Sequence, residues 1–130
     1  MVTFVFDASR GLDDLGLRAC QCSFCRAHGA RTTSDPGGTV RFAVRDRAAL
    51  QRYRFGLKTA DFLICRSCGV FVAAVMEEDG RRYATMNANA FQPPPAYDIV
   101  GAANDFGGED VGGRIARRTA KWTPVTEYPP

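Results

Sequence analysis

The chain has 130 residues, of which 45% are hydrophobic and 24% charged, and its formal net charge at pH 7 is +3. This length fits one domain with one core, and the composition excludes a fully disordered chain. A small positive surplus spread over several segments does not indicate a nucleic-acid-binding protein. No apolar run reaches the ~20 residues that a membrane span needs, and residues 1–7 show no signal peptide. We therefore expect a cytoplasmic protein without membrane or nucleic-acid partners.

Short strands are expected over most of the first 91 residues. Runs of alternating, β-branched or aromatic residues predict strands at 3–6, 39–44, 51–55, 61–64, 70–75 and 81–86. Asp79-Gly80, between the last two runs, is typical of a tight hairpin turn. Asp46 is expected to cap a single helical turn. The polar stretches 7–16 and 26–38 are interpreted as loops.

The composition changes after Phe91. Gln92-Pro93-Pro94-Pro95 ends regular structure, and a segment rich in glycine and acidic residues follows. Residues 114–122 fit either a short helix or an extended tail, with a basic face that we expect to be solvated. The chain is therefore divided into a β domain at 1–91 and a Pro/Gly-rich segment with a C-terminal arm at 92–130, packed on the same domain. The predicted fold class is all-β, with small antiparallel sheets.

All five cysteines lie in two short runs, with Cys20, Cys22 and Cys25 in the first and Cys65 and Cys68 in the second. An odd number cannot pair completely into disulfides, and a reducing compartment favours metal binding or catalysis instead. Thiolates at these spacings suit a tetrahedral soft-ligand site, for which Zn²⁺ is the first candidate. Gly69 after the second run is suited to the tight turn of a metal-binding knuckle.

The spacing leaves several interpretations open. Cys22, Cys25, Cys65 and Cys68 could form one closed structural zinc site, with Cys20 spare. Alternatively, Cys20, Cys22 and Cys25 could hold one zinc with a fourth position open to water or substrate, which is the arrangement of a catalytic zinc. A third interpretation is a set of buried or redox-active thiols without metal.

The sequences CQCSFCR at 20–26 and CRSCG at 65–69, with a glycine at Gly29 and strands between them, resemble the glutathione-dependent formaldehyde-activating (GFA) family, which includes the CENP-V-like proteins. The similarity spans residues 2 to about 91. The C-terminal segment with Arg117, Arg118 and 121–125 also looks like C-termini of this family. The resemblance implies a β-tent fold, built from small antiparallel sheets around zinc.

The resemblance further implies that Cys20, Cys22 and Cys25 hold an open, catalytic zinc. The family's second, structural zinc uses an N-terminal CxC together with the later CxxC. Here only the CxxC half, Cys65 and Cys68, is present. Asp7 and His28 are the candidate replacement ligands, although an isolated histidine such as His28 is more often a polar loop residue.

The implied activity is that of a carbon–sulfur lyase acting on a thiol–aldehyde adduct, such as the S-hydroxymethylglutathione formed from glutathione and formaldehyde. Arg26, Arg31 and Arg54 are candidates for binding the carboxylates of glutathione. The alternative function is a non-enzymatic binding module, stabilised by a closed four-cysteine zinc site.

Overall fold

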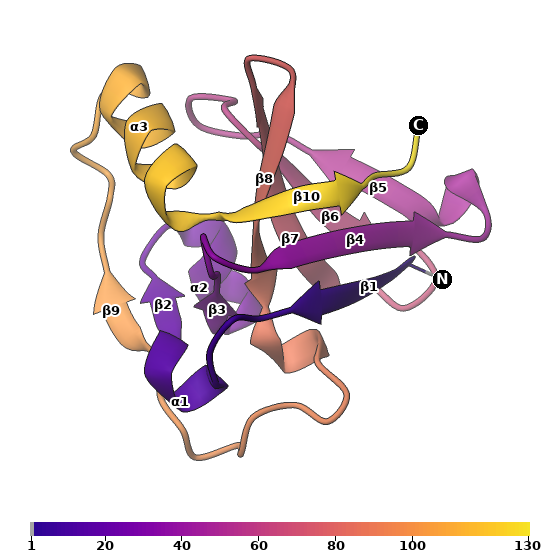
Figure 1. The fold of residues 1–130 in the computed structure, drawn as a ribbon, viewed down its shortest axis with the longest axis horizontal. Helices are drawn as coiled ribbons and strands as arrows, with labels where there is room; N and C mark the ends of the chain where they lie inside the picture. Colours follow the sequence, from indigo (N-terminus) through magenta and orange to yellow (C-terminus); the bar gives the residue numbers. More distant parts are fainter. Residues whose placement is uncertain (1) are drawn as a thin grey trace.

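The fold is given by a computed structural model that describes residues 2–130 (Figure 1). Met1, where the predicted β domain begins, lies outside the described residues. The strands are β1 (Val2–Asp7), β2 (Arg18–Cys20), β3 (Thr32–Thr33), β4 (Thr39–Val44), β5 (Leu50–Tyr53), β6 (Asp61–Cys65), β7 (Phe71–Glu78), β8 (Arg81–Asn87), β9 (Ala102–Asn104) and β10 (Thr123–Glu127). The helices are α1 (Leu12–Leu15), α2 (Ser23–His28) and α3 (Val111–Lys121), with 3₁₀ turns η1 (Arg47–Ala49) and η2 (Ala88–Ala90).

The last strand joins two groups of strands. Thr123 and Pro124 of β10 pair with β8, and then Val125 and Glu127 pair with β4, after which β1 forms the edge. On the other side of β8 lie β7, β6 and β5, while β3, β2 and β9 continue the sheet from the end of β8. Figure 1 shows β10, β4 and β1 side by side, crossing over β7 and β8. One part of the segment predicted as a C-terminal arm, Thr123–Glu127, is therefore a central strand.

The hairpin between β7 and β8 confirms the predicted turn. The two strands pair antiparallel from Ala73 opposite Met86 to Glu78 opposite Arg81. Both turn residues have positive φ, +52° at Asp79 and +74° at Gly80. Type I′ turns need positive φ at both central positions, and their twist matches that of the flanking strands.

Strand β7 is buried on both faces, as its continuous apolar sequence predicts. Val72 and Val75 pack into a core with β1 and β4. Phe71, Ala74 and Met76 pack on the other side, into a second core that contains Cys25 and Trp122. This second core connects the first cysteine run with the C-terminal helix.

The all-β expectation is confirmed only in part: strands are the main regular structure, but three helices interrupt them. Helix α2 begins inside the first cysteine run and ends at His28, in a stretch expected to be a loop. Residues 114–122, for which both a helix and an extended tail were considered, lie almost entirely in helix α3. The arginines of its basic face, Arg114, Arg117 and Arg118, are half-buried or buried rather than solvated, whereas Lys121 is exposed. Within residues 2–130, no helix combines the length and apolar character required to cross a membrane.

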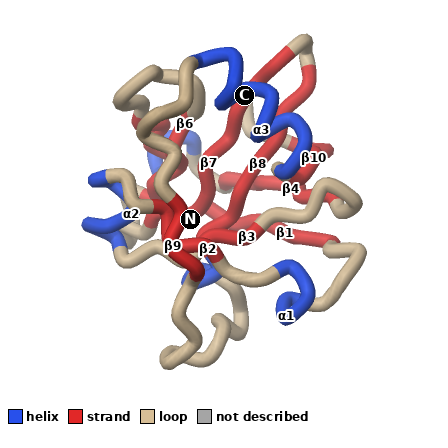
Figure 2. Tube along the Cα trace, turned by 90° about the vertical axis from the view of Figure 1, so that its left-hand side faces the viewer, coloured by secondary structure: helices blue, strands red, loops and turns tan. Residues whose placement is uncertain are grey.

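Strands β2, β3 and β9 and helix α3 gather at one end of the molecule, the end that faces the viewer in Figure 2. Short strands provide little pairing of their own, and β9 has only three residues. Their positions are therefore set by their neighbours in the sheet. This end of the molecule carries the three cysteines of the first run.

Candidate metal centre

Cys20 is placed by the parallel pairing of β2 with β9. It lies opposite Asn104, and the N–H of the following residue, Gln21, donates to the Asn104 carbonyl at 2.9 Å. The two strands approach closely at Gly101, where a Cβ atom would lie 2.9 Å from the backbone N of Ala19 and C of Arg18. Glycine at position 101 thus permits the pairing that holds Cys20.

Cys22 and Cys25 are placed by the start of helix α2. Cys22 is the N-cap residue, and its Sγ accepts a hydrogen bond from the Cys25 N–H at 3.4 Å. An N-cap side chain normally accepts a hydrogen bond from a free N–H of the first helical turn. When the side chain is a thiolate, the same hydrogen bond also stabilises the negative charge on its sulfur. Cys25 is buried, at 5% exposure, and belongs to the core beneath the helix.

The three sulfur atoms, Sγ of Cys20, Cys22 and Cys25, all lie within 4.8 Å of one another. Tetrahedral zinc with Zn–S bonds of about 2.3 Å requires neighbouring sulfurs at about 3.8 Å. The cluster therefore fits a metal ion with only a small adjustment of the side chains. This confirms the grouping predicted for the first run.

The pKa values of Cys20 and Cys25 are shifted in opposite directions. The hydrogen bond from the Cys25 thiol is the largest cause that lowers the pKa of Cys20, to about 5. The same hydrogen bond is the largest cause that raises the pKa of Cys25. A thiolate at Cys20 is thus stabilised by its neighbours, and thiolates are the form that binds a metal.

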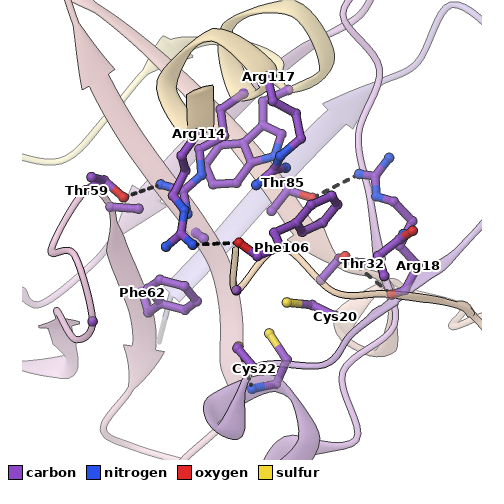
Figure 3. Close-up of a pocket in the computed structure, with 18 of the residues that line it drawn as sticks. Arg18, Cys20, Cys22, Thr32, Thr59, Phe62, Thr85, Phe106, Arg114 and Arg117 are labelled. Carbon is purple, nitrogen blue, oxygen red and sulfur yellow. Dashed lines mark hydrogen bonds between the residues drawn. The ribbon is translucent and has the colours of Figure 1, made fainter. Parts of the chain in front are cut away.

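The three cysteines line a cavity of about 150 Å³ beneath helix α3 (Figure 3). Phe62, Phe71, Ala74 and Trp122 supply apolar wall, and the loop after β9 contributes Phe106. Figure 3 shows Cys20 and Cys22 on one side of this space and Arg114 and Arg117 reaching in from the helix on the other. The cluster of three cysteines therefore faces this cavity.

Phe24 of helix α2 packs in a group of aromatic rings beside the cluster. Its centroid lies 4.9 Å from Phe62 and from Phe71, edge-on to each, and 5.4 Å from Phe55 in a stacked arrangement. Such pairs contribute beyond their buried area. The aromatic group fixes helix α2, and with it the positions of Cys22 and Cys25.

The cavity contains four arginines that the sequence analysis did not assign to a site: Arg18, Arg114, Arg117 and Arg118. The last three have the i, i+3, i+4 spacing that places residues on one helical face. This spacing was the one feature of the sequence that could have indicated that the three arginines lie together. It predicts a shared face but does not say whether the face meets solvent or protein.

The arginines proposed from charge alone lie elsewhere. Arg31 donates to the Asn89 side chain at 2.7 Å and to backbone carbonyls of the 95–99 loop. Arg54 pairs with Asp61 at 2.6 Å. Arg26 is exposed on helix α2. None of the three lines the cavity with the cysteines.

Cys65 and Cys68 lie apart from the three-cysteine cluster. They line a different cavity, together with Val2 and residues of β1. Among residues 2–130, the only group of three or more ligating side chains consists of Cys20, Cys22 and Cys25. A single closed site that combines both runs is therefore not formed.

The second run still has the form of a knuckle. The Gly69 N–H closes the turn onto the Cys65 carbonyl at 2.6 Å, with φ of +77° at Gly69. The backbone N–H of Val2 is the largest cause that lowers the pKa of Cys65, to about 7. The backbone of β1 thus faces the knuckle, and no third ligating side chain joins it within residues 2–130.

Neither candidate replacement ligand reaches a cysteine group. Asp7 pairs with Arg41 at 3.6 Å, at the opposite end of β1 from Val2. His28 is exposed, and its Nδ1 makes a hydrogen bond of 2.8 Å with the Phe24 carbonyl. Its ring packs against Phe24 at 4.2 Å. His28 is therefore a helix-end residue rather than a ligand.

Comparison with solved structures gives one informative match. A crystal structure of a Rhodobacter sphaeroides protein, a Northeast Structural Genomics target, is similar in fold. It has a TM-score of 0.56 and 27% sequence identity, and the match covers 78% of this chain and 90% of the other. No family model matches the sequence, and no curated protein matches it. The likeness supports the fold and carries no activity with it.

Proposed function

We propose that Cys20, Cys22 and Cys25 hold a zinc ion with one position open to the cavity. The observation that carries this proposal is the grouping of three sulfurs, without a fourth ligating side chain among residues 2–130, at the wall of an interior space. Structural zinc sites have four protein ligands, whereas catalytic sites have three and leave one position free. A three-sulfur site facing a cavity is of the second kind.

On this basis the protein acts as a carbon–sulfur lyase on a thiol–aldehyde adduct, in the manner that the GFA resemblance implies. The adduct R–S–CH₂–OH loses its hydroxyl proton, the C–S bond breaks, and the products are formaldehyde and the thiol, whose sulfur takes up a proton. Bound zinc would supply Lewis-acid chemistry for a sulfur or an aldehyde oxygen. The reverse direction joins a thiol to formaldehyde.

The chain's own residues contribute the surroundings of this reaction. Phe62, Phe71 and Trp122 limit the access of water, which strengthens electrostatic interactions within the cavity. Positive charge at Arg117 also helps to lower the pKa of Cys20. Arg117 therefore favours sulfur in its anionic form, which is both the ligand and the leaving group, although burial acts in the opposite direction.

The test uses zinc-loaded protein with formaldehyde and small thiols, and follows adduct formation and decay by NMR. We expect the wild-type chain and Cys68→Ser to accelerate exchange, and Cys20→Ser to lose both zinc and acceleration. Cys68→Ser is a matched control, because it removes one exposed thiol outside the cavity. Equal rates with and without protein, in a chain that binds zinc, would refute the lyase proposal.

A further inference from the structure

Arg118 is a buried cation with an unused donor. Its exposure is 6%, and its Nε has no hydrogen-bond partner within residues 2–130. One terminal nitrogen donates to Thr59 Oγ1 at 2.7 Å, and the guanidinium lies over the Trp122 ring at 4.6 Å. No carboxylate among the described residues pairs with it. Buried charges are ordinarily paired, so the cavity contains a cation without its counter-charge.

Arg18 is in a similar situation at another wall of the same cavity. It is half-buried and donates to the hydroxyls of Ser34 at 2.6 Å and Thr85 at 3.3 Å. These neutral acceptors fix the guanidinium without neutralising it. Within residues 2–130 it also forms no ion pair with a carboxylate. Two of the four cavity arginines are therefore held in place by uncharged groups.

The other two arginines share one carboxylate. Arg117 makes a two-pronged interaction with Glu109, at 2.8 and 3.0 Å, and Arg114 lies 3.5 Å from the same carboxylate. Arg114 also donates to the Phe106 carbonyl at 3.0 Å. Its Nε is the atom that lies 3.5 Å from the Glu109 carboxylate, and it makes no hydrogen bond in the described chain. Glu109 thus positions this pair but offsets only one of its charges.

The charges around the cavity do not sum to zero, and the surplus is positive. The four guanidiniums carry four positive charges; Glu109, which pairs with Arg117 and Arg114, and Asp105, which lines the cavity, supply two negative charges. A zinc ion with three thiolates adds a single negative charge. One positive charge then remains uncompensated. Burial lowers the pKa of Arg118 only to about 10, so this side chain is still protonated at neutral pH.

The size and walls of the cavity restrict which anion fits. Its volume of about 150 Å³ is well below the ~300–1,000 Å³ of pockets that enclose drug-sized ligands. Its apolar walls, Phe62 and Phe71 among them, favour a ligand with some hydrocarbon. A carboxylate matches the planar donor arrangement of a guanidinium and carries one charge. A short carboxylic acid meets all three requirements.

We propose that Arg118, Arg114 and Arg18 form a carboxylate subsite of the metal cavity, and that the thiol component of the reaction is therefore a short mercaptocarboxylate rather than a neutral thiol. The choice of a thiol rests on the proposed zinc-dependent function, whereas the carboxylate subsite rests on the arginines alone. The competing explanation is that the arginines serve only to neutralise the thiolates. In that case the cavity would not distinguish an acid from its amide.

The test compares 3-mercaptopropionate with 3-mercaptopropionamide, which is nearly the same size but neutral. Binding to the zinc-loaded chain is followed by calorimetry and by the fluorescence of Trp122, the single tryptophan, which lies against Arg118. We expect the acid to bind at least about tenfold more tightly than the amide, the scale of one hydrogen bond to a charged group. Equal affinities in the wild-type chain would overturn the subsite.

Two variants locate the effect. Arg118→Met and Arg114→Gln should each reduce the preference for the acid to about twofold or less, because each removes a charged donor. Arg81→Gln removes the same charge from the exposed β7–β8 hairpin, outside the cavity, and should keep the full preference. Arg114→Gln, at a partly exposed position, keeps the test available if Arg118→Met does not fold. A preference that persists in Arg114→Gln and in a folded Arg118→Met would place the anion elsewhere.

Propionate and propionamide, which have no thiol, separate the two proposals. If the thiols bind no better than these analogues, the proposed zinc–thiol function fails. Propionate should nevertheless bind more tightly than propionamide, because the arginines do not depend on the sulfur. If the thiols bind better but acid and amide are equal, only the carboxylate subsite fails.

Discussion

The guanidinium carbon of Arg118 lies 4.6 Å from the centre of the Trp122 ring, and both side chains line the cavity of the three cysteines. Trp122 is also the C-cap residue that directly follows helix α3, one position before β10 begins. Its N–H donates to the Arg118 carbonyl at 2.8 Å. Because β10 is a central strand, the sheet fixes where the arginine-bearing helix ends.

The close contact of β9 with β2 predicts a distant effect on metal binding. In Gly101→Ala the new Cβ would meet the backbone of Arg18 and Ala19 at 2.9 Å, so the strands must separate and Cys20 must shift. We expect zinc affinity to fall by about 10–100-fold, the range seen when groups that orient ligands are changed. Competition with a chromophoric chelator measures it.

Gly108→Ala is the control for this variant. It lies in the loop after β9, and a Cβ atom there would have no neighbour within 4 Å. Its zinc affinity should match that of the wild-type chain. Unchanged zinc affinity in Gly101→Ala as well would show that Cys20 does not depend on this pairing.

Two fully buried threonines predict opposite responses to the same substitution. Thr123 Oγ1 accepts a hydrogen bond from the Asp35 N–H at 2.8 Å, whereas Thr33 Oγ1 has no partner within residues 2–130. Thr123→Val leaves a buried N–H unsatisfied and should lower the free energy of unfolding by about 1–3 kcal/mol. Thr33→Val removes an unsatisfied hydroxyl and should be neutral or stabilising. Chemical denaturation measures both, and a larger loss in Thr33→Val would contradict the assignment.

The pairing of Glu109 with Arg117 predicts a pH-dependent contribution to stability. The hydrogen bonds from Arg117 are the largest cause that lowers the pKa of Glu109 in the folded chain. A lowered folded pKa gives stability that is fully present above the unfolded value of about 4.3 and is lost as pH falls through the folded value. The difference in unfolding free energy between wild type and Glu109→Gln should therefore shrink below about pH 4.3. A difference independent of pH would show that the carboxylate's charge is not involved.

Local patterns predicted much of the β structure, and they included the grouping of Cys20, Cys22 and Cys25 as one of the interpretations of the cysteine spacing. The β7–β8 hairpin depends on Asp79-Gly80, and the contact of Cys22 with Cys25 at the start of helix α2 joins residues three apart, so neighbouring sequence contains the relevant information. The strand at 39–44 was likewise predicted by its alternation and is observed as β4.

The arginine wall of the cavity could not be predicted in this way. Whether Arg114, Arg117 and Arg118 meet solvent depends on where helix α3 packs, and that depends on β10 pairing with β4 and β8, strands distant in sequence. The separation of the two cysteine runs also results from pairing between strands that are distant in sequence. Cys65 ends β6 and faces β1, while Cys20 is held by β9, and no spacing rule relates these pairings.

The most direct test of the account is metal content per chain, combined with X-ray absorption to count sulfur ligands. We expect about one zinc bound by three sulfurs and one light atom in the wild-type chain, and the same result in the double variant Cys65→Ser/Cys68→Ser. Cys20→Ser should lose the metal. Four sulfur ligands in the wild-type chain, or zinc that survives Cys20→Ser and disappears with Cys65 and Cys68, would contradict an open site at Cys20, Cys22 and Cys25.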